Sequence, residues 1–167
     1  MAIVTTQFEL DAAIADGYRN IHVYSSANTW LIVTGDTRVT ACGSTRIEAL
    51  GNAHVVALDT AEVKACDTAL VKAYDSTRIW AFDSAHVEAR DFVRVSAFNI
   101  AHIWAFDSVR VSAYGSARVW AYGSTHVSAS GTTRVWAWDS ARVWAYGSAR
   151  AEAYDFAQVL GVGARNS

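Results

Sequence analysis

The pattern of hydrophobic and polar positions repeats every eight residues along most of this 167-residue chain. The clearest stretch, Gly115 to Ala145, reads GSARVWAY, GSTHVSAS, GTTRVWAW and DSARVWA. From Gly35 the period runs unbroken to Val162, which gives 16 copies, and two degenerate copies precede it in residues 19–34. Each regular copy begins with Gly, Asp or Asn, and we number its places one to eight from that residue. The repeat therefore predicts the architecture of the fold, although it does not indicate a catalytic or binding activity.

Three of the eight places predict the inner face of a β-strand. The third place is Ala, Thr or Val, the fifth is Val or Ile except at Ala151, and the seventh is Ala except at Gly161. Because successive side chains of a strand point to opposite faces, these places share one face, and the fourth, sixth and eighth form the other. The outer face is then mostly Arg or His, a variable residue and an aromatic residue. Strands of about five or six residues should meet at the Gly/Asp-Ser corners, where Gly tolerates a positive φ.

The sixth place indicates how many copies make one turn of the chain. From residue 104 it alternates between two residue types, as Trp104, Ser112, Trp120, Ser128 and Trp136, so its true period is 16 residues. Two copies per turn would place residues 16 apart directly above each other, with a Trp column on one side and a Ser column on the other. We therefore predict an all-β fold, a two-sided parallel β-solenoid with about 8 to 9 coils in a shaft about 40 Å long.

Two other folds stay open from the pattern alone. Gly-Ser between alternating strands is also a hairpin signal, which would give an antiparallel meander with one strand per copy. A three-sided solenoid with 24 residues per coil would place Cys66 directly above Cys42. The alternation of Trp and Ser favours the two-sided form over the triangle, because it requires a 16-residue period.

The start of the chain has a different pattern, which predicts a capping helix. Thr6 to Glu9 forms a capping box, in which the Thr hydroxyl and the Glu carboxylate satisfy amides at the helix start. Leu10, Ala13 and Ile14 follow at helical spacing, and Gly17 is placed to end the helix. We expect a helix over about residues 7–16 that lies across the first rung of the solenoid.

The composition is that of one ordinary domain and narrows the range of partners. The formal net charge is −2 and Pro is absent, so we expect neither a nucleic-acid binder nor a disordered chain. Without a membrane-length apolar run or a secretory signal, we expect no membrane partner and a location in the cytoplasm or in a phage particle. Within one structural domain, we expect a capping helix in residues 1–18, a solenoid in 19–162 and a tail without a second capping helix in 163–167.

A family resemblance lies in the repeat region. The run of Ala121 to Thr125, inside a 16-residue double repeat, resembles the repeat of bacterial ice-nucleation proteins, and similar octapeptide arrays occur in bacterial and phage proteins. The resemblance implies a two-sided solenoid, outward Thr-x-Thr rows that order water, and Tyr ladders that pair molecules. In this chain, however, the places where that family has its threonines are mostly Ala or Val, and they point inward by parity.

No catalytic or metal-binding constellation stands apart from the repeat. All the histidines are predicted at the fourth place, where the other copies mostly have Arg: His22, His54, His86, His102 and His126. Of these, His86 and His102 should stack, but by parity no carboxylate or thiol is expected at their level, so we predict no metal there. Instead, the charge of this face should rise below about pH 6.5. A first-place acidic column is predicted to serve the turns rather than calcium: Asp59, Asp75, Asp91 and Asp107. We expect no cofactor and no enzyme activity.

The remaining candidate surface is the outer face of three successive coils. It consists of His102, Trp104, Phe106, Arg118, Trp120, Tyr122, Arg134, Trp136 and Trp138. Stacked aromatic rings with flanking Arg stabilise one another by about 0.5 to 1.5 kcal/mol each, and they would form a patch of several hundred Å². We therefore predict a structural or interaction module that forms homo-oligomers through this face. Two alternatives stay open: a surface for glycans that stack on Trp and Tyr, and an ice-binding protein.

Overall fold

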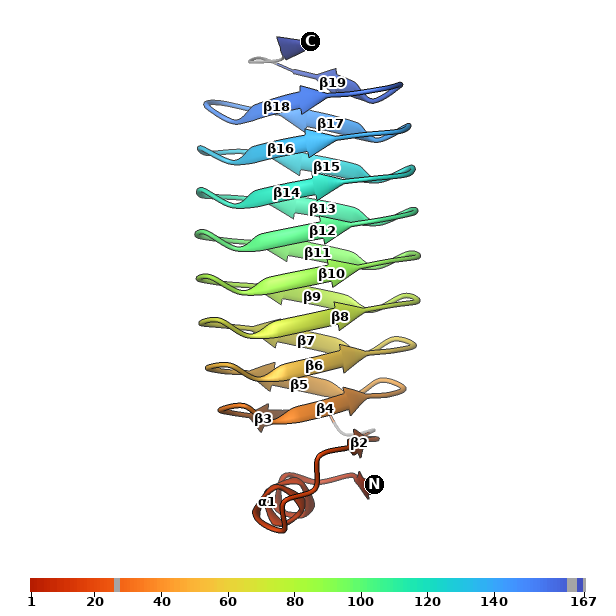
Figure 1. Cartoon of the computed structure of the whole chain (residues 1–167), viewed down its shortest axis with the longest axis vertical. Coiled ribbons are helices and arrows are strands. Elements are labelled where there is room, and N and C mark those ends of the chain that lie inside the picture. The colour runs from red at the N-terminus through yellow and green to blue at the C-terminus, as the bar shows by residue number, and fades with distance from the viewer. Residues whose placement is uncertain (26–27, 162–164, 167) are drawn as a thin grey trace.

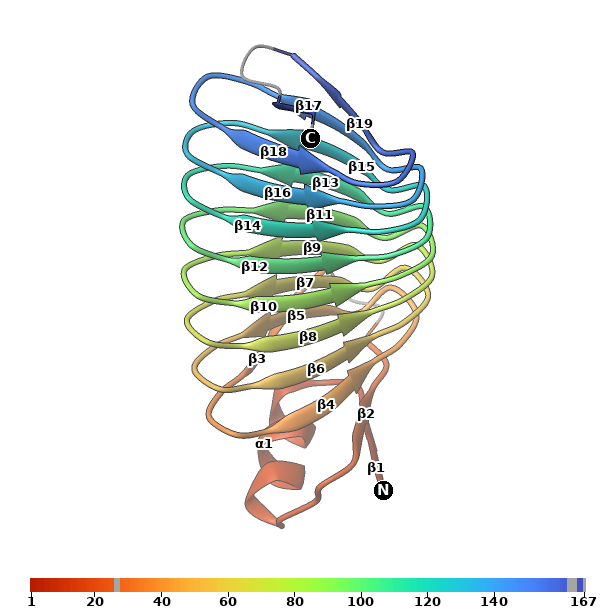
Figure 2. The same cartoon turned by 45° about the horizontal axis from the view of Figure 1, so that its top comes forward.

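The fold is a two-sided parallel β-solenoid, as the repeat predicts (Figures 1 and 2). The computed structural model describes residues 1–25, 28–161 and 165–166. Each 16-residue coil contributes one strand to sheet A and one to sheet B. Sheet A contains β1 (Ala2–Val4), β2 (Ile21–Val23), β4 (Arg38–Ala41), β6 (His54–Ala57), β8 (Leu70–Ala73), β10 (His86–Ala89), β12 (His102–Ala105), β14 (Arg118–Ala121), β16 (Arg134–Ala137), β18 (Arg150–Ala153) and β20 (Arg165–Asn166). Sheet B contains β3 (Trp30–Val33), β5 (Arg46–Ala49), β7 (Glu62–Ala65), β9 (Arg78–Ala81), β11 (Arg94–Ala97), β13 (Arg110–Ala113), β15 (His126–Ala129), β17 (Arg142–Ala145) and β19 (Gln158–Leu160).

The strand register excludes both rival folds. All neighbouring strands listed above pair in parallel, and in the regular coils each residue pairs with the one 16 positions away, as Trp104 does with Trp120. Ser96 pairs in the same way with Ser112 on sheet B, so the Trp and Ser columns lie on opposite faces. Most strands contain four residues, from the fourth to the seventh place, and not the five or six expected. The strands are shorter because the remaining four places form the turn.

The core between the two sheets is built from small side chains. The third, fifth and seventh places are buried from Val39 to Ala153, and only the end positions Thr37, Ala157 and Gly161 are more exposed, so the predicted inner face is confirmed. At three third-place threonines the hydroxyl donates to the carbonyl of the preceding eighth place: Thr45 to Cys42 (2.7 Å), Thr125 to Tyr122 (2.6 Å) and Thr133 to Ser130 (2.6 Å). These local bonds let a buried hydroxyl occupy a position otherwise held by Ala or Val. The buried Thr77 hydroxyl lacks such a partner within the part of the chain that the structure describes.

The turns confirm the predicted role of the first-place aspartates. Asp59 and Asp75 have φ angles of 60° and 57°, the left-handed region that Gly occupies in other copies. The Asp75 carboxylate also accepts a hydrogen bond from the Asp59 N–H (3.1 Å), one coil below. The Asp59 carboxylate accepts in the same way from Gly43 (2.8 Å). Each aspartate therefore shapes one turn and holds the turn beneath it.

The N-terminal cap contains the predicted helix and an additional strand. Helix α1 (Gln7–Ala15) begins at the Thr6 capping box, and Gly17 follows it with a φ of 75°. The helix lies beneath the first coils (Figure 1), but β1, which the sequence did not predict, precedes it and pairs with β2. Within residues 1–25, 28–161 and 165–166, no helix has the length and hydropathy of a membrane span.

The register of the first coil corrects one prediction. Ile21 pairs with Val39, 18 positions away, so the first coil is two residues longer than the regular 16-residue coils. His22 consequently pairs with Thr40 at the sixth place, and its assignment to the fourth-place column was wrong. The degenerate spacing of residues 19–34 concealed this insertion. The expected tail also contains a short strand, because β20 pairs with β18.

Candidate interaction surface on sheet A

The structure brings the predicted surface residues together on three adjacent strands of sheet A. The register of β12, β14 and β16 aligns them in three columns. These columns are the fourth-place His102, Arg118 and Arg134, the sixth-place Trp104, Trp120 and Trp136, and the eighth-place Phe106, Tyr122 and Trp138. Each column runs along the shaft and crosses the strands.

The sixth-place tryptophans form a continuous stack. The ring centroids of Trp104 and Trp120 are 4.9 Å apart with an interplanar angle of 6°, and those of Trp120 and Trp136 are 5.2 Å apart at 15°. The stack also contains His86, which the sequence reasoning left out, because its ring lies against Trp104 at 5.8 Å and 16°. All three indoles are half-buried, since each covers its neighbour while one edge remains exposed.

A second stack runs along the eighth place and is longer than predicted. Phe106 stacks on Tyr122 (5.1 Å) and Tyr122 stacks on Trp138 (4.7 Å). The stack continues to Tyr154 (5.2 Å from Trp138), and the Arg90 guanidinium lies over Phe106 at 4.7 Å. The sequence reasoning missed both Arg90 and Tyr154, although each lies one 16-residue step from a predicted member.

The fourth-place cations flank the Trp stack without covering it. Arg118 and Arg134 are exposed, and among the described residues neither forms an ion pair. The expected cation–π contact of this surface is made by Arg90 and not by these two side chains. Their guanidinium groups are therefore available as hydrogen-bond donors at the edge of the surface.

His86 and His102, which the repeat predicts to stack, instead meet edge to face at an interplanar angle of 62° and form a directly bonded pair. His102 Nδ1 lies 3.2 Å from His86 Nε2, and the ring centroids are 4.8 Å apart. Burial, followed by the neighbouring charges of His86 and Arg118, lowers the pKa of His102. His102 should consequently gain its positive charge at a lower pH than the fourth-place pattern predicted.

One premise of the metal prediction was wrong, because a carboxylate does share the outer face with this pair. Glu88 lies two residues after His86 on β10, but its carboxylate contacts Arg90 (2.9 Å) and Lys72 (3.5 Å). These contacts lower the pKa of Glu88. No group of three or more His, Cys, Asp or Glu side chains placed to hold a metal occurs in residues 1–25, 28–161 and 165–166.

A groove continues the surface toward the N-terminal end of sheet A. It has a volume of 620 Å³, runs over β2, β4, β6, β8 and β10, and ends at Trp104. Its lining includes Thr40, Val56 and Leu70. The groove exists because the sixth place holds Thr40, Val56, Lys72 and Glu88 in the coils from β4 to β10, where later coils hold Trp. That difference is visible in the sequence, but the sequence reasoning examined only the aromatic copies.

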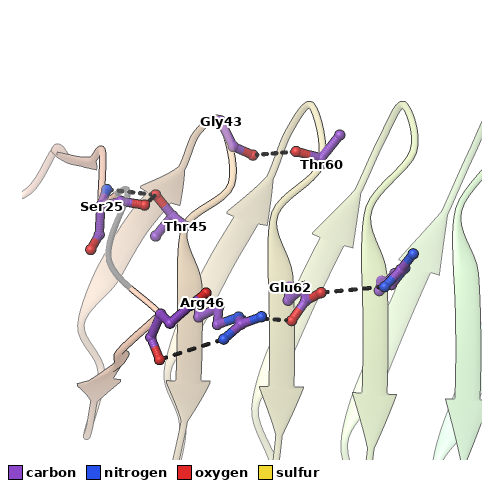
Figure 3. A network of polar contacts seen from close by, with 8 residues as sticks. Ser25, Gly43, Thr45, Arg46, Thr60 and Glu62 are labelled. Atoms are coloured by element: carbon purple, nitrogen blue, oxygen red, sulfur yellow. Dashed lines mark hydrogen bonds and ion pairs between the residues drawn. The ribbon is translucent and has the colours of Figure 1, made fainter.

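The outer face of sheet B differs at the sixth place, although it also carries a ring stack at the eighth place, formed by Phe82, Phe98 and Tyr114. Its sixth place carries the Ser96, Ser112 and Ser128 column. Figure 3 shows part of this sheet, where Glu62 accepts from Arg46 (3.0 Å) and pairs with Arg78 (3.5 Å). Near the same coils, the Thr60 hydroxyl donates to the Gly43 carbonyl at a turn, and the buried Thr45 hydroxyl accepts from the Ser25 N–H (Figure 3).

The side chains of the third and fifth places point into the core, which differs from the arrangement implied by the resemblance to ice-nucleation proteins. Threonine at the third place is buried at residues 45, 77, 125 and 133 and points into the core. The outward Thr-x-Thr rows that the resemblance implies are therefore not formed by these places in the described coils.

The fold and the surface define a class of protein, the repeat β-solenoid with stacked aromatic side chains on its outer faces. This architecture is compatible with a structural or interaction role, because solenoids present extended regular surfaces. No family model, no curated protein and no solved structure matches the chain.

Proposed function

We propose that the chain is a non-enzymatic structural module that associates with itself through the aromatic columns of sheet A. The observation that supports this proposal is the presence of two continuous ring stacks side by side on sheet A, at the sixth and eighth places. Sheet B has one such stack, at the eighth place (Phe82, Phe98 and Tyr114), and a Ser column at the sixth place. Half-buried aromatic residues with exposed edges, flanked by Arg, are the composition that interfaces favour at their centres. A flat repeated face also meets a copy of itself by simple twofold symmetry.

The test is the oligomeric state of a double variant, measured by light scattering. Trp120→Ser together with Trp136→Ser should convert the assembly into monomers, because the variant removes two of the three indoles of the stack. Trp144→Ser is the matched control, since Trp144 occupies the same place of the repeat on sheet B. A parent chain that is monomeric at high concentration would contradict the proposal.

A glycan-binding surface is the alternative, supported by the exposed Arg side chains beside the indoles. Sugars stack on ring faces, but in these columns the faces are occupied by neighbouring rings, so that only the ends of each stack offer one. This geometry favours self-association over glycan stacking. A monomeric parent that binds on a glycan array, and loses binding in the double Trp variant, would support the alternative. Ice binding has the least support and is tested by freezing hysteresis.

A further inference from the structure

The outer face of sheet A has two halves of opposite shape. The half from β2 to β10 carries the 620 Å³ groove, with Thr40 and Val56 at the sixth place. The half from β12 to β16 carries the ridge, which we define as Trp104, Trp120 and Trp136 in the same column. The groove ends at Trp104, the residue at which the ridge begins. Groove and ridge are therefore collinear on one face.

We infer that two copies of the chain pair in opposite directions through sheet A, so that the ridge of each copy fills the groove of the other. This inference rests on the proposed self-association and specifies its geometry. The groove is centred on β6 and the ridge on β14, so the twofold axis crosses β10, midway between them, and runs parallel to the strands. Trp120 then lies opposite Val56 of the second copy, and Trp136 lies opposite Thr40.

The buried area distinguishes the antiparallel ridge-in-groove dimer from a dimer in which the two ridges contact each other. From β2 to β18, the face of sheet A is about 40 Å long and about 17 Å wide, which gives about 700 Å² per copy. A stable dimer needs about 800 Å² per partner, so the full face is close to sufficient. If the two ridges met each other, contact would be limited to three rungs, about 250 Å² per copy. Only the antiparallel arrangement uses most of the face.

The side chains that meet in this arrangement are mostly compatible. At the eighth place, Tyr122 lies opposite Leu58, an apolar pair. At the sixth place, Lys72 lies opposite Trp104, where an ammonium can contact an indole. Glu152 lies opposite His22, whose sixth-place register brings it into line with the ridge column.

Like charges also meet. On the axis itself, β10 brings Glu88 opposite Glu88 and Arg90 opposite Arg90 of the second copy, with each Glu88 held by the Arg90 of its own chain (2.9 Å). The fourth place brings basic side chains together. Arg134 lies opposite Arg38, and Arg118 lies opposite His54 of the second copy. The three arginines are exposed on the monomer, His54 is half-buried, and all four form the border of the interface, where water and salt screen the repulsion between the arginines. Added salt should therefore strengthen the dimer.

The first test fills the groove while keeping the ridge. Val56→Trp places an indole where the Trp120 ring of the second copy would lie, so the dissociation constant should rise at least tenfold by analytical ultracentrifugation. Ser112→Trp is the matched control, because it adds an indole at the same place on sheet B and should leave the constant unchanged. Circular dichroism verifies that both variants keep the β-solenoid.

The second test reads the direction of pairing and does not depend on Val56→Trp folding. Packed sheets lie about 10 Å apart, so a short bismaleimide suits the distance better than a disulfide. In a chain with Cys42→Ala and Cys66→Ala, we expect a mixture of His22→Cys and Glu152→Cys chains to cross-link to each other. Self-linked Glu152→Cys dimers, or a dimer unaffected by Val56→Trp, would overturn the antiparallel geometry and leave self-association standing. A monomeric parent would overturn both.

Discussion

At the scale of single residues, the first-place aspartates perform two tasks in this solenoid. Asp75 adopts a φ of 57°, and its carboxylate accepts the Asp59 N–H of the coil below. Asp is tolerated in the left-handed region better than most residues that carry a Cβ, because its short polar side chain bonds locally. The carboxylate bond gives Asp a stabilising contact that Gly at the same place lacks.

Replacing Asp75 separates these two contributions. Asp75→Ala should lower the free energy of unfolding by about 1 to 2 kcal/mol, because it loses the hydrogen bond and retains an unfavourable φ. Asp75→Gly loses only the hydrogen bond and should cost less. Urea unfolding monitored by circular dichroism provides both values, and equal losses in the two variants would show that the backbone angle contributes nothing.

His102 should make stability depend on pH below neutrality. Its pKa is lowered in the folded state by burial and by the charges of His86 and Arg118, so the unfolded chain binds the proton more readily. The free energy of unfolding should therefore fall as the pH drops below about 6.5, by at most about 1.4 kcal/mol per pH unit. We expect His102→Gln to flatten this slope in urea unfolding measured from pH 7.5 to 5.5. A slope identical to that of the parent would refute the role of His102.

At the scale of elements, helix α1 closes the exposed edge of sheet B. The Gln7 side chain accepts from the Ile32 N–H (2.7 Å) and donates to the Ile32 carbonyl (3.0 Å). Ile32 lies on β3, the first strand of that sheet, so one side-chain amide supplies the bonds that a further strand would make. The capping box and Gly17 were readable from local sequence, whereas Gln7 was not, because its partner lies 25 residues away.

Gln7→Ala should expose this edge and loosen the first strand of sheet B. We expect a loss of about 1 to 2 kcal/mol and faster hydrogen exchange at the Ile32 amide, with coils beyond β7 unaffected. Gln7→Glu is a partial control, because it retains the acceptor for the Ile32 N–H but loses the donor and brings a negative charge against the Asp11 carboxylate that the Gln7 amide contacts (2.7 Å). Unchanged exchange at Ile32 in the Ala variant would argue against the edge-closing role.

At the scale of the whole molecule, the parity of the repeat decides which face each later strand occupies. Deleting residues 91–98 removes β11 alone, so every strand after it changes sheets and the ridge moves to the face opposite the groove. Deleting residues 83–98 removes β10 and β11 and leaves ridge and groove on one face. The two deletions therefore differ in the placement of the same surfaces.

These deletions should produce different assemblies. The eight-residue deletion should replace dimers with open-ended filaments, because ridge and groove on opposite faces form a contact that does not close on itself. The 16-residue deletion should keep a closed dimer. Its free energy of unfolding should fall by roughly the contribution of one coil, because the stability of a solenoid is approximately a sum over its repeats. Electron microscopy and light scattering distinguish these results, and a closed dimer from the shorter deletion would contradict the ridge-in-groove arrangement.

The sequence predicted the features that every coil repeats and missed those that single coils introduce. The inner face, the turn aspartates and the Trp104 to Trp136 column follow from the period, because each depends only on the coil above and below. The register of His22 depends on the length of one irregular connection. The groove depends on the small volume of Thr40 and Val56 relative to their neighbours, which a search for chemically reactive or aromatic residues passes over.

The direction of the ladder hydrogen bonds has a mechanical consequence. Bonds such as that from the Cys66 N–H to the Ala49 carbonyl join one coil to the next and therefore lie along the shaft. A force that pulls the two ends of the shaft apart acts along these hydrogen bonds. The terminal coil should open first, and the interior coils should follow. Each opened coil releases 16 residues, about 53 Å of extended chain. Under tension the molecule should therefore lengthen in equal steps, each corresponding to the unfolding of one coil.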